Sequence, residues 1–183
     1  MIQSRTLLQY MLRPDLAAAA LLRRLVGIRV STWFVNIIFQ RVLRLNGDAP
    51  FQVHFTSTVV APSQIVVGRN VWKSFARSGG CYVQGGNGVH IGDDSLFGPG
   101  VKIVSANHSP ETSMAWCSAP PVKIGRRCWI GANAVILAGV DLGDDCVVGA
   151  GAVVTKSFPA GSVIGGVPAR LLSKHGSGTA SAH

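Results

Sequence analysis

The sequence of 183 residues predicts a mainly β fold, a parallel β-helix, preceded by a basic helical segment. Three observations predict it. An apolar residue recurs at every sixth position, small residues and glycine recur at the same spacing, and the segment 1–54 follows neither pattern. A period of six fits neither the 3.6-residue stripe of a helix nor the strict alternation of a half-buried strand. It fits short strands joined by tight corners and stacked in coils.

The six-residue period is clearest in the second half of the chain. An aliphatic residue recurs at Ile124, Ile130, Ile136, Leu142, Val148 and Val154. A second residue of core size follows each by four positions, at Cys128, Ala134, Val140, Cys146, Ala152 and Phe158. The same phase runs earlier through Ile91, Phe97 and Ile103 with Ser95 and Val101, and more faintly through Ala61, Ile65, Val67 and Val71. The alternative, a β-sandwich, would place its turn signals at a longer spacing, so the shorter period favours the β-helix.

The period is interrupted in the stretch "VSANHSPETSMAWCSAPPVKIG", between Val104 and Gly125. It stops just after His108 and resumes about a dozen positions later. A histidine has a pKa near neutral pH and can therefore act as a general base. A histidine in a polar turn is more often simply solvated or hydrogen-bonded. From the residues alone, both interpretations of His108 stay open.

A resemblance to a known family rests on "IGDDSLFGPGVKIVSANH" and "KIGRRCWIGANAVILAGVDLGDDCVVGAGAVVTKSFPAGSVIGGVPARLL". This part of the chain resembles the hexapeptide-repeat acyltransferases with a left-handed parallel β-helix. Within them it is similar to the group of galactoside, xenobiotic and polysaccharide-modifying O-acetyltransferases. The domains expected are an N-terminal basic helical segment over 1–54, a left-handed β-helix acyltransferase domain over 55–172 and a disordered tail over 173–183. The resemblance implies acetyl-CoA as the acyl donor.

The resemblance also implies catalytic roles. In this family the histidine before the protruding loop is the general base, and His108 matches that position. The loop helps to wall the acceptor pocket at the junction with a neighbouring subunit of a trimer. A tetrahedral oxyanion needs a hydrogen-bond donor, which would be Asn107 or a backbone N–H near Trp129 to Ala132.

The last coils resemble the edge that binds coenzyme A in this family. The residues carried over are Ala132 and Ala150 along the pantetheine arm, Thr155 and Lys156 near the adenosine diphosphate end, Arg170 near its phosphates, and Trp129 beside the thioester arm or the acceptor pocket. Alternatives remain for each of them. Small residues are also required at tight corners, and Lys156 is also consistent with an ordinary solvated charge.

A metal site is a competing interpretation, because His90 precedes His108 by one full coil of an uninterrupted three-sided helix. The metal-dependent γ-class carbonic anhydrases share this fold, and a zinc enzyme needs three protein ligands. The paired histidines at five-residue spacing expected from them do not occur in the sequence. We therefore expect no metal, with His90 packed or facing solvent.

The four cysteines, Cys81, Cys117, Cys128 and Cys146, show no C-x-x-C spacing, and we interpret them as reduced cytosolic thiols. Cys128 and Cys146 fall on inward positions of the repeat, one coil apart. The basic residues after position 50 are scattered, without a compact patch interleaved with aromatic residues, which disfavours nucleic acid as a partner. No secretory leader is expected at the N-terminus.

The segment 1–54 carries seven arginines against Asp15 and Asp48, a net charge of +5. Its charge-free run extends only from Val30 to Gln40, roughly half the length that spans a bilayer. Aromatic and aliphatic residues beside the arginines, such as Trp33 and Phe34, suit an interfacial helix on anionic lipid. Packing of the same apolar face on the β-helix or on a neighbouring subunit is the open alternative.

The function expected is transfer of acetyl from acetyl-CoA to a sugar hydroxyl in polysaccharide biosynthesis. The enzyme is expected to be a cytoplasmic trimer, and peripheral binding to the inner face of the membrane stays open as described above. The alternatives are an amino-sugar N-acyltransferase, a drug O-acetyltransferase, or a catalytically silent β-helix that serves as a scaffold. The sequence "SANH" at 105–108 disfavours the scaffold.

Overall fold

The computed structural model describes residues 30–107 and 117–174. The chain divides into two compact units, Met1–Val35 and Asn36–His183. The boundary falls within helix α3 (Val30–Ile37), which continues as a π-helical segment, Ile38–Val42. Among the described residues, none of the helices is both long enough and apolar enough to span a bilayer.

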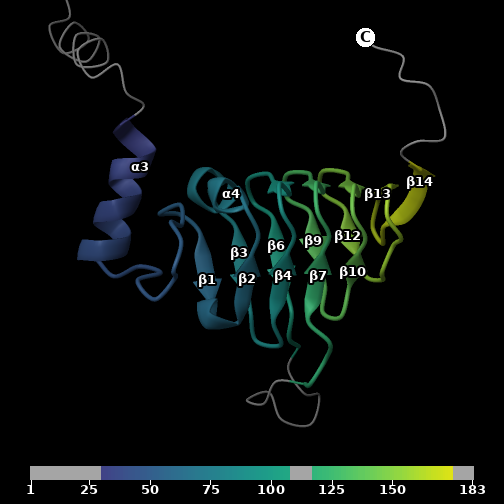
Figure 1. Cartoon of the computed structure of the whole chain (residues 1–183), viewed down its shortest axis with the longest axis horizontal. Coiled ribbons are helices and arrows are strands. Elements are labelled where there is room, and N and C mark those ends of the chain that lie inside the picture. Colours follow the sequence, from purple (N-terminus) through teal and green to yellow (C-terminus); the bar gives the residue numbers. More distant parts are fainter. Residues whose placement is uncertain (1–29, 108–116, 175–183) are drawn as a thin grey trace, which may run out of the picture. The chain divides into compact units, whose positions relative to one another are not determined.

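The second unit winds as a parallel β-helix with three faces, which confirms the predicted fold class (Figure 1). Face 1 is formed by β1 (Thr58–Val60), β3 (Tyr82–Gln84), β6 (Lys102–Val104), β9 (Val135–Ile136) and β12 (Val153–Val154). Face 2 is formed by β2 (Ile65–Val67), β4 (Val89–Ile91), β7 (Val122–Ile124) and β10 (Asp141–Leu142). Face 3 is formed by β5 (Leu96–Phe97), β8 (Trp129–Ile130), β11 (Val147–Val148), β13 (Ser162–Gly165) and β14 (Arg170–Lys174).

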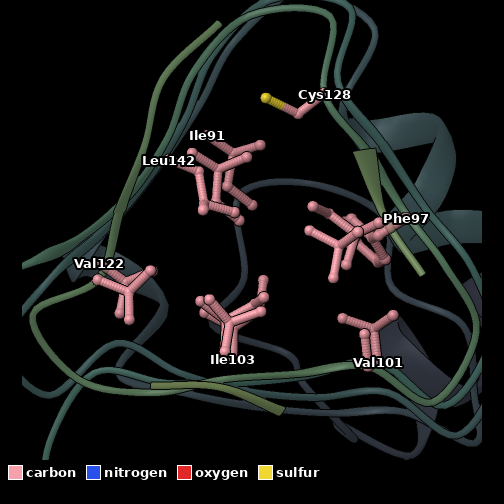
Figure 2. Close-up of a cluster of buried hydrophobic side chains, with 14 of the residues drawn as sticks. Ile91, Phe97, Val101, Ile103, Val122, Cys128 and Leu142 are labelled. Carbon is pink, nitrogen blue, oxygen red and sulfur yellow. The ribbon is translucent and has the colours of Figure 1, made fainter. Parts of the chain in front are cut away.

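The core consists of two kinds of inward position, as the two series of the repeat predict. Figure 2 shows Ile91, Phe97 and Ile103 pointing inward from the three faces, and Val122 and Cys128 filling corners. All of these side chains are buried. Fully burying a side chain of the size of isoleucine contributes about 1.5–3 kcal/mol. Stacked coils repeat this contribution, so apolar burial is the main source of stability in the regular coils.

The corners follow a local pattern in which a glycine is followed, two positions later, by a residue with positive φ. Between faces 2 and 3 these residues are Asp94 (φ 60°), Arg127 (φ 55°) and Asp145 (φ 59°). Glycine is required at the start of the corner because the coils touch there. A Cβ at Gly92 would lie 2.7 Å from the carbonyl carbon of Gly125. Close stacking of the coils thus explains the six-residue spacing of glycine.

Charged pairs also stack at the corner between faces 2 and 3. In successive coils the sequence there reads "GRN", "GDD", "GRR" and "GDD". Arg69 pairs with Asp94 at 2.7 Å, and Arg126 and Arg127 pair with Asp144 and Asp145 at 2.8 and 2.6 Å. Exposed ion pairs add little stability. Their alternation favours one register of the coils over a shifted one.

Two departures from the repeat have structural causes. The helix α4 (Trp72–Arg77) replaces a strand between β2 and β3, so the coil from Val67 to its partner Ile91 is one repeat unit longer than the regular coil from Ile124 to Leu142. This insertion accounts for the loss of period between 73 and 88. At the other end Phe158 is buried but pairs with Leu142, so it takes a face position where the repeat assigns it to a corner. The coil that ends there is two positions shorter.

Side-chain amides close the N-terminal end of the β-helix. Asn46 binds two backbone groups at the edge strand β1: its Nδ2 donates to the carbonyl of Ser57, just before the strand, and its Oδ1 accepts from the Val59 N–H, both at 2.8 Å. Asn36, fully buried, accepts from the Phe55 N–H. These amides substitute for the strand that a further coil would provide.

Gln40, buried in the π-helical segment, extends this closure. Its Nε2 contacts the carbonyls of Asn46, Ala49 and Phe51, and its Oε1 accepts from the Val53 N–H at 3.2 Å. At the opposite end of the prism, β14 pairs antiparallel with β13 and ends the stack. The two ends of the β-helix are therefore closed by different interactions: hydrogen bonds from side-chain amides at the N-terminal end and an antiparallel strand at the C-terminal end.

Candidate functional site

The interruption of the repeat lies at the corner between faces 1 and 2. It connects β6 to β7, and residues 108–116 within it, including the predicted base His108, lie outside the described residues. Strand pairing shows how large the interruption is. Ile91 pairs with Ile124 across it, whereas Ile124 pairs with Leu142 in the next, regular coil. The first separation along the chain is nearly twice the second, so one coil carries a long excursion.

A hydrogen-bonded cluster, here named the loop base, holds both ends of this excursion: Gln84, Asn87, Ser105, Asn107 and Cys117. Asn87 Nδ2 donates to the carbonyls of Ser105 at 3.0 Å and Cys117 at 2.8 Å. Ser105 Oγ donates to the Gln84 carbonyl at 2.7 Å. The Cys117 N–H donates to the Asn107 carbonyl at 2.7 Å. The excursion thus begins and ends at one fixed point.

Asn107, the predicted oxyanion donor, lies at the rim of the loop base. Ser105 and Ala106 before it are buried, and Asn107 is exposed. The Ala106 N–H donates to the buried Gln84 Oε1 at 3.0 Å, which holds the backbone just before Asn107. The chain therefore leaves the core at Asn107, immediately before the residue predicted to act as the base.

The two alanines predicted along the pantetheine arm, Ala132 and Ala150, stack at the corner between faces 3 and 1. The Gly151 N–H donates to the Ala132 carbonyl at 2.8 Å. A Cβ at Gly131 would lie 2.5 Å from the Ala150 nitrogen, so the coils are in close contact here. This close contact explains why glycine is needed at position 131, whereas the roles of Ala132 and Ala150 stay predictions. Ala132 is half-buried and Ala150 is exposed.

The remaining predicted donor residues are all exposed and lie in three places. Trp129 is on face 3, where 62 % of its surface is accessible, between Leu96 and Val147 of the neighbouring strands. Thr155 and Lys156 follow β12, at the same corner as the loop base and two coils further along. Lys156 Nζ lies 5.7 Å from the centre of the Phe158 ring. Arg170 begins β14.

One chain therefore does not bring all the predicted site residues together. Asn107, Thr155 and Lys156 share the corner between faces 1 and 2, while Ala132 and Ala150 share the corner on the other side of face 1.

Face 2 has a hollow of about 500 Å³. The outward residues His90, Lys123 and Asp141 follow one another in register along it, and all three are exposed. None of the predicted site residues lines this hollow. Over residues 30–107 and 117–174, no group of three or more histidine, cysteine or acidic side chains is arranged to hold a metal ion.

Cys128 and Cys146 occupy inward corner positions, as the repeat predicts, and all four cysteines are free. Burial raises the pKa of the Cys128 thiol to about 11 and also raises the pKa of Cys146. Each thiol donates to a carbonyl of the following coil, Cys128 to Gly143 at 3.2 Å and Cys146 to Pro159 at 3.3 Å. Protonated buried thiols are inert, so these two cysteines have a packing role.

Sequence reasoning missed Gln84, Asn87 and Ser105 of the loop base. Asn87 lies in "GGNG", where the repeat is lost, and one of its partners is far away along the chain, at Cys117. The only available signal was that a polar residue stood where the period failed. Because the partners are backbone carbonyls, no complementary residue type marks them in the sequence.

The comparisons with known proteins agree with this architecture. Residues 121–156 match the family described as "hexapeptide repeat of succinyl-transferase". The chain is 34% identical over 113 residues to a galactoside O-acetyltransferase of Escherichia coli (strain K12), covering 60% of this chain and 54% of that one. It is 37% identical over 99 residues to the putative lipopolysaccharide biosynthesis O-acetyl transferase WbbJ of the same organism, covering 48% and 50%.

A similar solved structure is a hexapeptide-repeat-containing acetyltransferase of Vibrio cholerae O1 biovar eltor complexed with acetyl coenzyme A, with a TM-score of 0.56, 26% identity and coverage of 74% of this chain and 76% of that one. The chain spans about half the length of the curated relatives that it matches. The resemblance drawn from the sequence is confirmed at this level: residues 121–156 match the hexapeptide-repeat family, and the chain is similar in sequence and in fold to hexapeptide-repeat acetyltransferases.

Proposed function

We propose that this protein transfers an acetyl group from acetyl-CoA to a hydroxyl of a sugar destined for a polysaccharide. The observation that carries the proposal is the long excursion after "SANH", at one fixed corner of a hexapeptide-repeat β-helix. Support also comes from the similarity to two proteins named as O-acetyltransferases, one for galactosides and one for lipopolysaccharide biosynthesis. The four free cysteines fit a reducing compartment, so we propose a cytoplasmic location.

In the proposed reaction His108 removes the proton of the sugar hydroxyl as the oxygen attacks the thioester carbonyl. A C–O bond forms and a tetrahedral oxyanion develops, which Asn107 or a backbone N–H between Trp129 and Ala132 stabilises by hydrogen bonding. The C–S bond then breaks, and the proton held by His108 passes to the departing thiolate of coenzyme A. Acetylated sugar and free coenzyme A leave.

The donor is proposed to bind along Ala132 and Ala150, with Thr155 and Lys156 near its adenosine diphosphate end and Arg170 near its phosphates. The exposed cations Lys156 and Arg170 suit a polyanionic ligand. Since the two alanines and the loop base lie on opposite sides of face 1 in one chain, the proposal includes a trimer. A neighbouring copy that presents its alanine corner to the loop base would complete the site. Sedimentation should then give three times the chain mass of 19.2 kDa.

The substitution His108→Ala tests this function. Loss of a general base should lower kcat by about two to four orders of magnitude, while the affinity for coenzyme A measured by calorimetry stays close to that of the wild type. Release of the coenzyme A thiol, followed with nucleotide-linked, lipid-linked and free sugars, identifies the acceptor. Turnover by the variant equal to that of the wild type would exclude His108 as the base. Absence of acetyl-CoA binding in the wild type would favour the scaffold alternative.

We also propose that the N-terminal segment contacts an anionic membrane surface peripherally. In the described part of this segment, the burial of polar and apolar side chains is the reverse of that in an ordinary surface helix. Its amides Asn36 and Gln40 are buried, whereas Ile38 and Val42 are exposed, Val42 to 70 %. Each buried amide hydrogen-bonds to the backbone through both its nitrogen and its oxygen, so the amide side of this helix faces inward while Ile38 and Val42 face outward.

Basic residues accompany the exposed apolar side chains. Arg41 and Arg44 are exposed in the same stretch as Val42, Leu43 and Leu45. Aliphatic groups beside arginines are the combination that binds an interface with anionic lipid, where each basic residue contributes about 1 kcal/mol. The binding should therefore weaken as salt screens the charges.

Vesicle flotation tests the membrane proposal. The whole protein should float with vesicles of phosphatidylcholine and phosphatidylglycerol at low salt and much less at high salt. The double change Arg41→Gln and Arg44→Gln should reduce flotation severalfold, whereas the double change Lys102→Gln and Lys123→Gln on the β-helix, a matched loss of two exposed charges, should not. No flotation of the wild type at low salt would indicate that protein covers the apolar side.

A further inference from the structure

One side chain spans the two ends of the excursion. Asn87 lies in the turn between β3 and β4, and its two amide hydrogens are directed to carbonyls on opposite sides of the excursion, Ser105 before it and Cys117 after it. Its backbone N–H also donates to Ser105 Oγ at 3.0 Å. The two partners are twelve positions apart in the chain, and the same amide nitrogen holds both.

The geometry of an amide makes this contact restrictive. The two N–H bonds of the Asn87 side chain are coplanar and fixed in angle, so two acceptors bound together have a defined separation. Around this pair, Ser105 is fully buried and donates to Gln84, and the Cys117 N–H closes the ring by donating to Asn107. The separation of the two ends and the position of Asn107 are therefore set together.

At the regular corners, backbone groups form hydrogen bonds with other backbone groups of the same turn. The Ala134 N–H donates to the Gly131 carbonyl, and the Ala152 N–H donates to the Gly149 carbonyl, three positions earlier in each case. At the loop base the excursion replaces such a turn, and the Ser105 and Cys117 carbonyls receive a side chain from the preceding coil. The excursion is thus attached to the rigid body of the β-helix through Asn87.

We propose that Asn87 is a positioning residue for the acetyl transfer. It touches no reacting atom. By fixing Ser105 and Cys117 it holds Asn107, and the point where the chain continues into His108, in the orientation that transfer requires. This inference rests on the proposed function, in which Asn107 and His108 act on the substrate. The alternative is that Asn87 only stabilises the fold, and the test must distinguish this role from positioning.

The primary test compares Asn87→Ala and Asn87→Asp with Asn46→Asp in the full chain. Asn46 is a matched control because it also makes two hydrogen bonds to the backbone, but at the end of the prism. We expect the Asn87 variants to lose kcat by about 10- to 100-fold, the scale of a misplacement near 1 Å, with KM for acetyl-CoA changed less than about twofold. Asn46→Asp should lower the melting temperature and leave kcat unchanged.

A second readout does not depend on activity. Cys117 is half-buried at the loop base, whereas Cys81, Cys128 and Cys146 are buried, and burial raises the pKa of each of these three thiols. In the native protein a disulfide reagent should therefore label Cys117 first. If the Asn87 side chain holds the loop base closed, Asn87→Ala should speed the labelling of Cys117 by about tenfold. Asn46→Asp should leave the labelling rate unchanged.

The outcomes separate the two proposals. If the wild type transfers acetyl and His108→Ala does not, but the Asn87 variants keep wild-type kcat, the positioning role is wrong and the proposed function stands. If labelling of Cys117 is unchanged in Asn87→Ala, the amide does not hold the loop base. If the alanine variant does not fold, Asn87→Ser, which keeps one short donor, takes its place: full activity in it would also overturn the inference.

Discussion

The coils after the excursion and the N-terminal end of the prism are stabilised by different interactions. From Val122 to Val154, identical positions recur and each inward side chain stacks on its equivalent in the next coil. At the N-terminal end, Asn36, Gln40 and Asn46 each make hydrogen bonds that occur once. Periodic burial needs only a residue class at each position, while the closure of an end needs one particular side chain. The two regions should therefore respond differently to substitution.

Val148→Asp should have the largest effect. Val148 is 1 % exposed and lies between Ile130 and Ile164 of the neighbouring strands. An unpaired buried carboxylate costs several kcal/mol, about 3–5 kcal/mol, which is a large part of the stability of a domain. We expect the variant to be insoluble or unfolded by circular dichroism. Val147→Asp is the control, since the adjacent side chain is only half-buried and a carboxylate there should be tolerated. A folded Val148→Asp protein would contradict the register described here.

Gln40→Met should have an intermediate and local effect. The substitution preserves the side-chain volume but leaves the Phe51 carbonyl and the Val53 N–H without their partner, and each unsatisfied buried group costs about 1–3 kcal/mol. Hydrogen exchange should rise in residues 36–60 and remain slow in residues 122–154. The exposed Gln64 provides the control, Gln64→Met, which should leave exchange unchanged. Uniform acceleration in both regions would mean that the ends and the regular coils unfold as one unit.

His54 should give the smallest effect, visible as a pH dependence. Burial lowers its pKa from 6.5, and its Nδ1 accepts from the Thr56 N–H at 3.2 Å, a bond that protonation removes. Because the folded protein binds this proton less readily than the unfolded chain, stability should fall as the pH drops below 6.5 and level off below the folded pKa. Urea midpoints at pH 7.5 and 5.5 measure this, and His54→Gln should show a smaller difference between them. An equal difference in both proteins would rule out a contribution from His54.

Much of the fold was predictable because it repeats. The inward positions from Ile124 to Val154 are all buried, and the free cysteines Cys128 and Cys146 lie where the repeat places them. The prediction was wrong in register at Phe158, because a shortened coil shifts it to a face. A shortening by two positions preserves the apolar character of the segment, so the pattern alone does not reveal it.

The candidate site was predictable only in outline. The position of the excursion follows from where the period stops, and His108, which lies outside the described residues, remains a prediction. The roles of Asn107, Trp129, Ala132, Ala150, Thr155, Lys156 and Arg170 also remain predictions. The loop base was not predictable, because Asn87 binds backbone carbonyls, and every residue has a carbonyl.

The sequence by itself determined the six-residue period, the three-sided coil that follows from it, the inward residues and the place where the coil is interrupted. These features depend on the spacing of residues along the chain and on the removal of apolar side chains from water. Both can be read from the order of residue types. Only the tertiary structure decided which amides close the N-terminal end, how Asn87 joins Ser105 to Cys117, and that the predicted donor residues fall on opposite sides of face 1. Those features depend on distances between backbone groups in different coils, and such distances exist only once the coils have stacked.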